Sequence, residues 1–192
     1  MSKTICVFSS SSDEIPKHFF DCARELARLI TERNHALLYG GGNVGLMGEM
    51  SNTVKENNGK LIGVIPRLLH DKGYSFSAAS ELIVTLDMRE RKTIMEQRSD
   101  AFITMPGGFG TLEEFAELVT LKQLKYHWKP IILLNWHGYY DSLLKFFHQL
   151  FEQKFAMHKH EHIYKVVDTP QNAILEIERQ WAEEPLRKSK PF

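Results

Sequence analysis

The 192-residue chain has no excess charge of either sign, only two cysteines and no long apolar run. Its 24 basic and 24 acidic residues cancel, so nothing in the charge balance favours nucleic acid or an anionic membrane as a partner. Cys6 and Cys22 cannot form a disulfide framework, and each lies in an apolar pattern. We therefore expect two reduced thiols in the core rather than a redox pair.

Membrane and export signals are also missing. Apolar runs such as IILL are far too short to span a bilayer. The first residues, MSKTICVFSSSS, lack a charged region followed by a long apolar stretch. These absences predict a cytoplasmic protein.

Signatures of several enzyme classes are absent as well, because the chain contains no GxSxG, HExxH or CxxC motif. His158, His160 and His162 alternate in MHKHEH, yet no acid or cysteine at ligand spacing completes a metal site. A solvated loop is the preferred interpretation of this stretch. We expect neither a metal nor a cofactor.

What the chain does contain is an alternation of short apolar segments with longer segments of helical period. This pattern predicts the α/β class, with a Rossmann-like, open, mostly parallel sheet flanked by helices on both faces. Without a linker or an internal repeat, residues 1–184 form a single nucleotide-binding domain, and 185–192 form a polar, poorly ordered tail. The expected strands are 4–9, 36–40, 60–66, 81–86, 101–106, 130–135 and 164–167, and the expected helices are 16–33, 44–57, 88–98, 111–125, 139–152 and 170–181.

Three polar or glycine-rich stretches follow predicted strands: FSSSSD, YGGGNVGLMG and MPGGFGT. Ligands of open α/β sheets bind beyond the carboxyl ends of the strands, so we expect these stretches to converge on one site. Ser9 and the serines after it either donate hydroxyls to a phosphate or form an ordinary loop in which Asp13 starts the next helix.

In YGGGNVGLMG, Gly40, Gly42 and Gly45 match the GxGxxG spacing between a strand and a helix. No acidic residue ends the next strand about 20 residues later, as a dinucleotide site requires. The stretch is either a tight, closely packed turn or a turn that contacts a nucleotide through Gly41 and Gly42. We favour the second interpretation.

The stretch PGGFGTLEE is more specific. The backbone N–H groups of Gly107, Gly108, Gly110 and Thr111 are expected at a helix N-terminus, where free amides and the helix dipole favour an anion. The alternative is a capping box with Thr111 as the N-cap and Glu114 three residues later. Capping explains those two residues but not three glycines.

In LDMRERKTIMEQRSD, Asp87 and Glu90 have capping-box spacing, which predicts a helix beginning near Met88. The dipole disfavours cations in the first turns of a helix. The first turns of this helix nevertheless carry three cations, Arg89, Arg91 and Lys92. Either they form a solvated charged face or, as we prefer, at least one guanidinium faces an anion in the cleft.

In this order and spacing, YGGGNVGLMG, MRERKTIM and DAFITMPGGFGTLEE resemble the Lonely Guy (LOG) family of cytokinin riboside 5′-monophosphate phosphoribohydrolases, often labelled lysine decarboxylase-like. The resemblance runs from about Ile5 to Tyr140 and includes KPIILLNWHGYYDSLL. It implies hydrolysis of the N-glycosidic bond of a nucleoside 5′-monophosphate, a cytokinin riboside 5′-monophosphate or AMP, which releases free base and ribose 5-phosphate. The length fits the short, dimeric type of the family.

Carried over by position, the resemblance makes Arg91 and Glu114 the catalytic pair. It places substrate contacts at Lys92, at 108–111 and at Thr120. Two departures from the family pattern, Arg89 in place of a common histidine and FSSSSD without its usual glycine, bear on which base is accepted. The family also implies a homodimer, for which helices within 44–57 and 111–128 offer aromatic and Met side chains.

Two other functions compete with this one. A lysine decarboxylase needs a Schiff-base lysine and a partner for the pyridinium nitrogen of its cofactor, and the chain offers no such set. A non-catalytic module that binds a nucleotide or the molybdenum cofactor is the stronger rival. Glu114 argues against this alternative, because its carboxylate would repel the phosphate in a protein that only binds its ligand.

Overall fold

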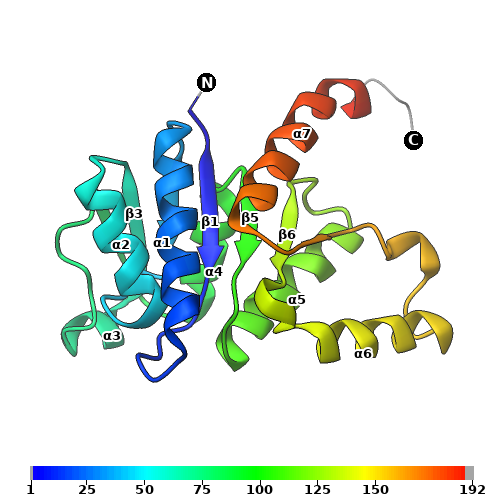
Figure 1. The fold of residues 1–192 in the computed structure, drawn as a ribbon, viewed down its shortest axis with the longest axis horizontal. Coiled ribbons are helices and arrows are strands. Elements are labelled where there is room, and N and C mark those ends of the chain that lie inside the picture. Colours follow the sequence, from blue (N-terminus) through cyan, green and yellow to red (C-terminus); the bar gives the residue numbers. More distant parts are fainter. Residues whose placement is uncertain (1, 189–192) are drawn as a thin grey trace.

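The computed structural model describes residues 2–188, and its centre is one seven-stranded sheet in which every pair of neighbouring strands is parallel (Figure 1). The strand order is β4-β3-β2-β1-β5-β6-β7. This confirms the predicted Rossmann-like α/β fold. The strands are β1 (Thr4–Phe8), β2 (Ala36–Tyr39), β3 (Leu61–Pro66), β4 (Glu81–Thr85), β5 (Ala101–Thr104), β6 (Ile131–Leu134) and β7 (Lys165–Val167).

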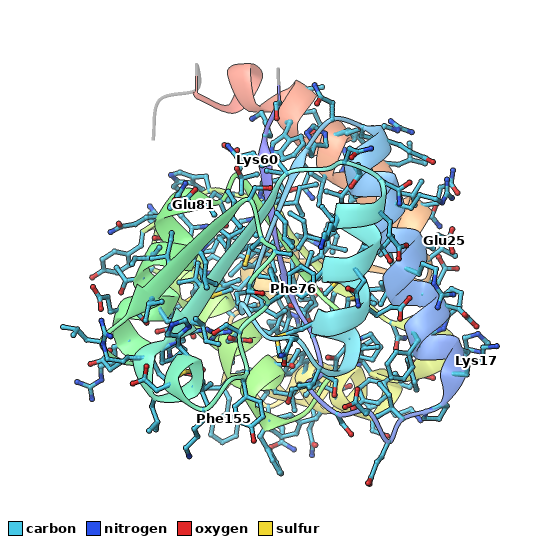
Figure 2. All side chains as sticks on the ribbon, turned by 90° about the vertical axis from the view of Figure 1, so that its left-hand side faces the viewer. Lys17, Glu25, Lys60, Phe76, Glu81 and Phe155 are labelled. Carbon is cyan, nitrogen blue, oxygen red and sulfur yellow. The ribbon has the colours of Figure 1, made fainter. Side chains whose placement is uncertain are left out.

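Helices cover both faces of the sheet, as the view from the β4 side shows (Figure 2). One core cluster lies under α1, α2 and α7, and a second lies under α4, α5 and the start of α6. The helices are α1 (Lys17–Glu32), α2 (Gly45–Glu56), α3 (Arg67–Asp71), α4 (Met88–Arg98), α5 (Phe109–Gln123), α6 (Asp141–Glu152) and α7 (Pro170–Lys188), with short 3₁₀ turns η1 (Trp136–Gly138) and η2 (His158–His160).

The strands read as continuous apolar runs because both of their faces are covered. In β1, Ile5 and Val7 enter the first core cluster, whereas Cys6 and Phe8 enter the second. Cys6 and Cys22 are both buried and unpaired, which confirms the expectation of core thiols.

The elements differ from prediction at three places. The short helix α3 was not expected, and α5 begins at Phe109, two residues before the predicted start. Helix α7 continues to Lys188, so the first residues of the expected tail, 185–188, are helical, while 189–192 lie outside the described residues. No helix within 2–188 is long and apolar enough to cross a membrane.

The sheet has its topological switch point between β1 and β5, because β2 to β4 lie on one side of β1 and β5 to β7 on the other. The arrow of β1 points to the lower edge of the view, where α6 also lies, whereas the start of β1 and the end of α7 lie at the opposite edge (Figure 1). Open α/β sheets bind ligands at this carboxyl edge, next to the switch point. The loops that follow β1, β2 and β5 all begin there, as predicted.

Candidate active site

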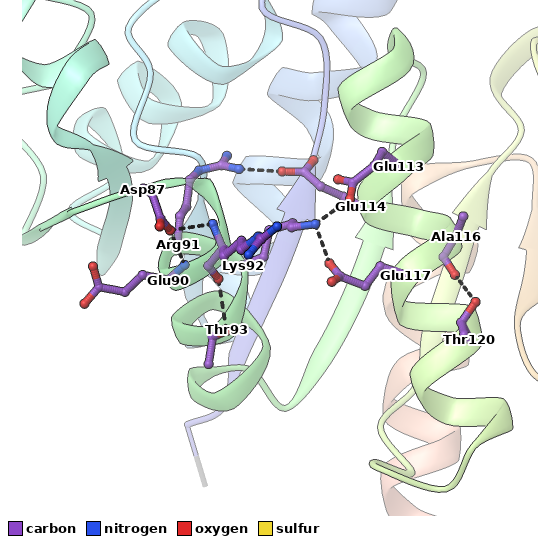
Figure 3. Close-up of polar contacts among 11 residues, drawn as sticks. Asp87, Glu90, Arg91, Lys92, Thr93, Glu113, Glu114, Ala116, Glu117 and Thr120 are labelled. Atoms are coloured by element: carbon purple, nitrogen blue, oxygen red, sulfur yellow. Dashed lines mark hydrogen bonds and ion pairs between the residues drawn. The ribbon is translucent and has the colours of Figure 1, made fainter.

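The central feature of this edge is a buried ion pair between two helices (Figure 3). Arg91 of α4 donates from Nη1 to Oε1 of Glu114 in α5, at 2.6 Å, and each residue is only 8% exposed. The Nε of Arg91 donates to the carbonyl oxygen of Val64 at 3.1 Å. The guanidinium is therefore fixed to β3 at one end and to the carboxylate at the other.

Local capping places Arg91 on the inner face of α4. Asp87 is the N-cap, and its carboxylate accepts from the N–H groups of Arg89 and Glu90 at 2.8 and 2.9 Å. Glu90 in turn accepts from the N–H of Leu86 at 2.6 Å. The predicted start at Met88 is confirmed. Arg91 then lies one turn before the fully buried Met95, on the same face of the helix.

The first glycine turn makes room for this guanidinium. A Cβ on Gly40 would collide with Nη2 of Arg91. Since Gly40 directly follows β2 and Val64 lies in β3, the guanidinium of Arg91 contacts the chain at both strands. Arg91 thus faces the carboxylate of Glu114, and a contact of this guanidinium with an anionic ligand stays a prediction.

Burial and the ion pair act on Glu114 in opposite directions. Burial raises the pKa of its carboxyl, and this outweighs Arg91, which lowers it. A buried ion pair is weak evidence for stability, because desolvation of two charges offsets much of their attraction. A perturbed carboxyl at the ligand-binding edge of the sheet is more often a functional group.

Beside the pair lies the N-terminus of α5. Its N-cap is Gly108, with no side-chain cap, and Thr111 lies within the first turn, so the capping-box interpretation of Thr111 is wrong. Among residues 2–188 no acceptor is bound by the N–H groups of 108–111. A Cβ on Gly108 or Gly110 would meet nothing within 4 Å. Open space and free amides at a helix N-terminus are what an anion requires.

Two other predicted contacts flank these amides. Ser9 follows β1, and its buried Oγ has no hydrogen-bond partner in the part of the chain described here. Such an orphaned hydroxyl next to the switch point is suited to a ligand contact. Gly107, in contrast, is buried, and its carbonyl accepts from the Tyr139 hydroxyl at 2.8 Å, so it faces the protein.

The N-terminus of α2 is closed by the protein itself. The N–H of Gly45 donates to Oδ1 of Asp13 at 2.8 Å, and the next N–H donates to the carbonyl of Ser10 at 3.0 Å. Gly41 and Gly42 are buried, and the carbonyl of Gly41 accepts from the N–H of Phe76. The start of α2 is thus closed by the protein itself, and a contact of Gly41 and Gly42 with a nucleotide stays a prediction.

Lys92 and Thr120 lie apart from the free amides. The ammonium of Lys92 binds the carboxylates of Glu113 and Glu117, the latter at 3.0 Å. Thr120 is exposed further along α5, and its hydroxyl donates to the carbonyl of Ala116 at 2.8 Å (Figure 3). Lys92 nevertheless lines a cavity that Glu114 also lines, whereas Thr120 is not part of it.

A cavity of about 280 Å³ lies between α4 and α5 and reaches Glu114. Both apolar and charged side chains line it. The lining residues are Phe8, Lys92, Thr93, Glu96, Glu114, Glu117, Leu118, Leu121 and Tyr126. Elsewhere, the histidines of 158–162 lie around η2, and no cluster of potential metal ligands occurs among residues 2–188.

Sequence reasoning missed two carboxylates at this edge. Asp13 was expected at most to start a helix, yet it caps α2 across 32 positions, a contact that no local pattern signals. Glu113 had no expected role, but it binds Lys92. Here a signal existed, because Glu113 and Glu117 have the spacing that puts two carboxylates on one helix face.

Comparison with known proteins shows the family of the chain. The family described as "Possible lysine decarboxylase" matches residues 47–177. A protein of Arabidopsis thaliana named as a probable cytokinin riboside 5′-monophosphate phosphoribohydrolase is 42% identical over 176 residues, which is 92% of this chain and 88% of that protein. A rice protein (Oryza sativa subsp. japonica) with the same activity in its name is also 42% identical, over 92% of this chain and 70% of its own length.

Among solved structures, the molybdenum cofactor carrier protein of Chlamydomonas reinhardtii superposes with a TM-score of 0.73 at 26% identity. The match covers 95% of this chain and 99% of the carrier. The fold is therefore shared by named enzymes and a named carrier, but the sequence is distinctly closer to the enzymes. The chain belongs to the Lonely Guy family, to which the description "possible lysine decarboxylase" has also been attached.

Proposed function

We propose that this protein is an N-glycosidase that hydrolyses nucleoside 5′-monophosphates to free base and ribose 5-phosphate. Cytokinin riboside 5′-monophosphates are the proposed substrates, in line with the names of the relatives, and AMP is a further one. The observation that carries the proposal is the buried Glu114 carboxylate, held by Arg91 beside the free amides of α5.

The spacing within α5 suits a ribose 5-phosphate. Glu114 lies five positions after Phe109, which corresponds to about 7.5 Å along the helix axis. This separation leaves room for a sugar between the amides and the carboxylate. In the proposed complex the 5′-phosphate binds the amides of 108–111 and the Ser9 hydroxyl, while the carboxylate of Glu114 lies near the anomeric carbon.

The proposed chemistry follows from the charge at that carbon. As the bond to the base breaks, the sugar develops oxocarbenium-like positive charge, which a carboxylate stabilises. Glu114 then either activates a water molecule or attacks the carbon itself. Arg91 orients the carboxylate and favours its ionised form against the effect of burial. The raised pKa of Glu114 also suits a group that exchanges a proton during the reaction.

A carrier of a nucleotide or of the molybdenum cofactor is the second candidate, favoured by the fold shared with the Chlamydomonas carrier. A carrier needs the free amides but gains nothing from a buried carboxylate next to its anionic ligand. The Arg91–Glu114 pair therefore favours the hydrolase.

The test is incubation of the protein with a panel of nucleoside 5′-monophosphates, including N6-substituted adenine forms and AMP, with chromatography for released base. We expect Glu114→Gln to reduce turnover by at least about 10³-fold while retaining substrate binding, since it keeps the shape but not the charge. Glu81→Gln is a matched control, because Glu81 is also ion-paired but lies with Arg98 outside this site. If no nucleotide releases base, or if Glu114→Gln turns over like the wild type, the hydrolase is ruled out.

A homodimer is part of the proposal. The segment that follows α5 exposes Leu124, Tyr126 and Trp128, by 59, 76 and 58%. The Met side chains expected on 44–57 do not contribute, since Met50 is buried and Met47 packs against the core. Light scattering after size-exclusion chromatography measures the mass, and a stable monomer contradicts the dimer. The cytoplasmic location stays a prediction, supported by the unpaired thiols.

A further inference from the structure

Two adjacent tyrosines reach from the β6–α6 connection to the glycine loop. The hydroxyl of Tyr139 donates to the carbonyl of Gly107 at 2.8 Å, and that of Tyr140 donates to the carbonyl of Met105 at 2.7 Å. Both carbonyls belong to the segment between β5 and α5. Neither tyrosine had an expected role beyond lying in the stretch that resembles the family.

Peptide geometry gives these two bonds a consequence for the anion site. A trans peptide unit is planar, and its C=O and N–H point in opposite directions. When Tyr139 draws the carbonyl of Gly107 towards the protein, the N–H of Gly108 in the same unit is turned the other way. That N–H has no acceptor among residues 2–188, and Gly108 is exposed.

The chain before Gly107 is held by Tyr140. The hydroxyl of Tyr140 is bound to the carbonyl of Met105, two residues before Gly107, and burial raises the pKa of this hydroxyl. Tyr139 therefore holds the peptide unit after Gly107, and Tyr140 holds the chain at Met105, where the segment leaves β5.

The tyrosines are themselves held in place. The side-chain oxygen of Asn135 accepts from the N–H of Tyr140 at 2.7 Å, and its nitrogen donates to Asp141 at 2.8 Å. The ring of Tyr139 packs edge-on against Phe19, with 5.6 Å between ring centroids. The hydroxyls are thus fixed without any ligand.

Packing alone does not require a hydroxyl at Tyr139. Its side chain is nearly half exposed, at 46%, and a phenylalanine would make the same ring contact with Phe19. Within residues 2–188, the only hydrogen bond of this hydroxyl is the one to Gly107.

We propose that Tyr139, with Tyr140, is a positioning residue that sets the glycine loop so that the amide of Gly108 is directed at the phosphate of the ligand. The proposal rests on the phosphate position given under the proposed function. Its physical basis is preorganisation: an amide that is already oriented binds without first paying the entropy of ordering the loop.

The test compares Tyr139→Phe with the wild type by calorimetric titration of ribose 5-phosphate and inorganic phosphate. We expect the variant to bind both about five- to tenfold more weakly, the usual effect of one lost hydrogen bond. In turnover assays KM rises by a similar factor, whereas kcat changes less than about twofold, because Glu114 and Arg91 are untouched. Tyr164→Phe is the control, since it removes a hydroxyl from a ring that packs on Phe115 and Phe147.

Tyr140→Phe extends the test, although this residue is only 2% exposed and its loss also lowers the melting temperature. Unchanged phosphate affinity in Tyr139→Phe overturns the proposal, as does a fall in kcat at constant KM. Failure of the wild type to bind either probe at millimolar concentration overturns it as well. If the probes bind as expected but no nucleotide is hydrolysed, the proposed function fails and the positioning role stands.

Discussion

Two segments of this molecule, β2–α2 and β5–α5, each consist of a strand, a glycine-rich turn and a helix. The N-termini of the two helices nevertheless differ in whether their amides have acceptors. At the start of α2, the N–H groups of Gly45 and Leu46 are taken by Asp13 and Ser10. At the start of α5, the N–H groups of 108–111 bind no acceptor within the described part of the chain. One helix N-terminus carries its own anion, and the other is free for a ligand.

The difference shows that a glycine pattern alone does not define an anion site. The turn before α2 (residues 40–45, the closed turn) matches GxGxxG. The loop before α5 (residues 107–110, the open loop) has only the looser GGxG spacing. A helix N-terminus can bind an external anion only if the fold brings no acceptor of its own to the amides of the first turn. In the closed turn the glycines instead allow close packing, against the serine loop at Gly45 and against Arg91 at Gly40.

The largest effect on the free energy of unfolding is expected when a methyl group is added to the closed turn. Gly45 has a φ of +60°, and its Cβ would lie 2.5 Å from the carbonyl carbon of Ser11. Left-handed backbone costs an alanine about 1 kcal/mol, and overpacking adds about 1–3 kcal/mol. Gly45→Ala should therefore lower the free energy of unfolding by about 2–4 kcal/mol, measured by urea denaturation.

Gly73→Ala separates these two contributions. Gly73 also has a positive φ, +81°, but a Cβ there would meet nothing within 4 Å. We expect a loss of only about 1 kcal/mol from backbone strain. Equal losses at the two positions would show that the turn at Gly45 is not closely packed against the serine loop, and the contrast between the turns would weaken.

A smaller effect is expected when the internal anion is removed. Asp13→Ala takes away the carboxylate bound to the N–H of Gly45, and loss of such a cap costs about 0.5–2 kcal/mol. Urea denaturation measures it, with Glu14→Ala as the neighbouring control. Added phosphate should not restore the stability, because the backbone of Ser10 and Ser11 still fills the space next to Gly45. Recovery in phosphate would mean that Asp13 alone keeps this turn closed.

Much of this comparison was predictable from the sequence. Alternating apolar and helical segments gave all seven strands, and parallel topology requires that the loops after β1, β2 and β5 meet at one edge. The Asp87–Glu90 spacing placed the start of α4, and with it the inward position of Arg91. These features depend on local pattern and on general rules of α/β topology.

The states of the two turns were not predictable in the same way. Closure of the first turn depends on Asp13, which lies 32 positions from Gly45 in sequence, and on the path of the serine loop. The free amides of α5 depend on a helix that begins before Thr111 rather than after it. Contacts over such sequence distances leave no periodicity, so only the folded chain displays them.

The smallest effect on stability is expected when a methyl group is added to the open loop. This change should instead weaken ligand binding, in contrast to the changes in the closed turn. Gly110 lies in the first turn of α5, where a Cβ meets nothing within 4 Å, so Gly110→Ala introduces no clash. The better helix propensity of alanine should leave the free energy of unfolding unchanged or raise it by up to about 1 kcal/mol. The new methyl group nevertheless narrows the space above the free amides. We expect the affinity for ribose 5-phosphate to fall roughly three- to tenfold, equivalent to about 0.7–1.4 kcal/mol.

Phe109→Ala provides the control for this change, because it removes a side chain that is 93% exposed on the same turn and keeps the backbone amide. A methyl group in the closed turn is thus expected to affect folding, and a methyl group in the open loop to affect binding. If Gly110→Ala binds ribose 5-phosphate as tightly as the wild type, the space above Gly110 is not where the phosphate binds. The open amides would then be a property of the helix end alone, with no bearing on the ligand.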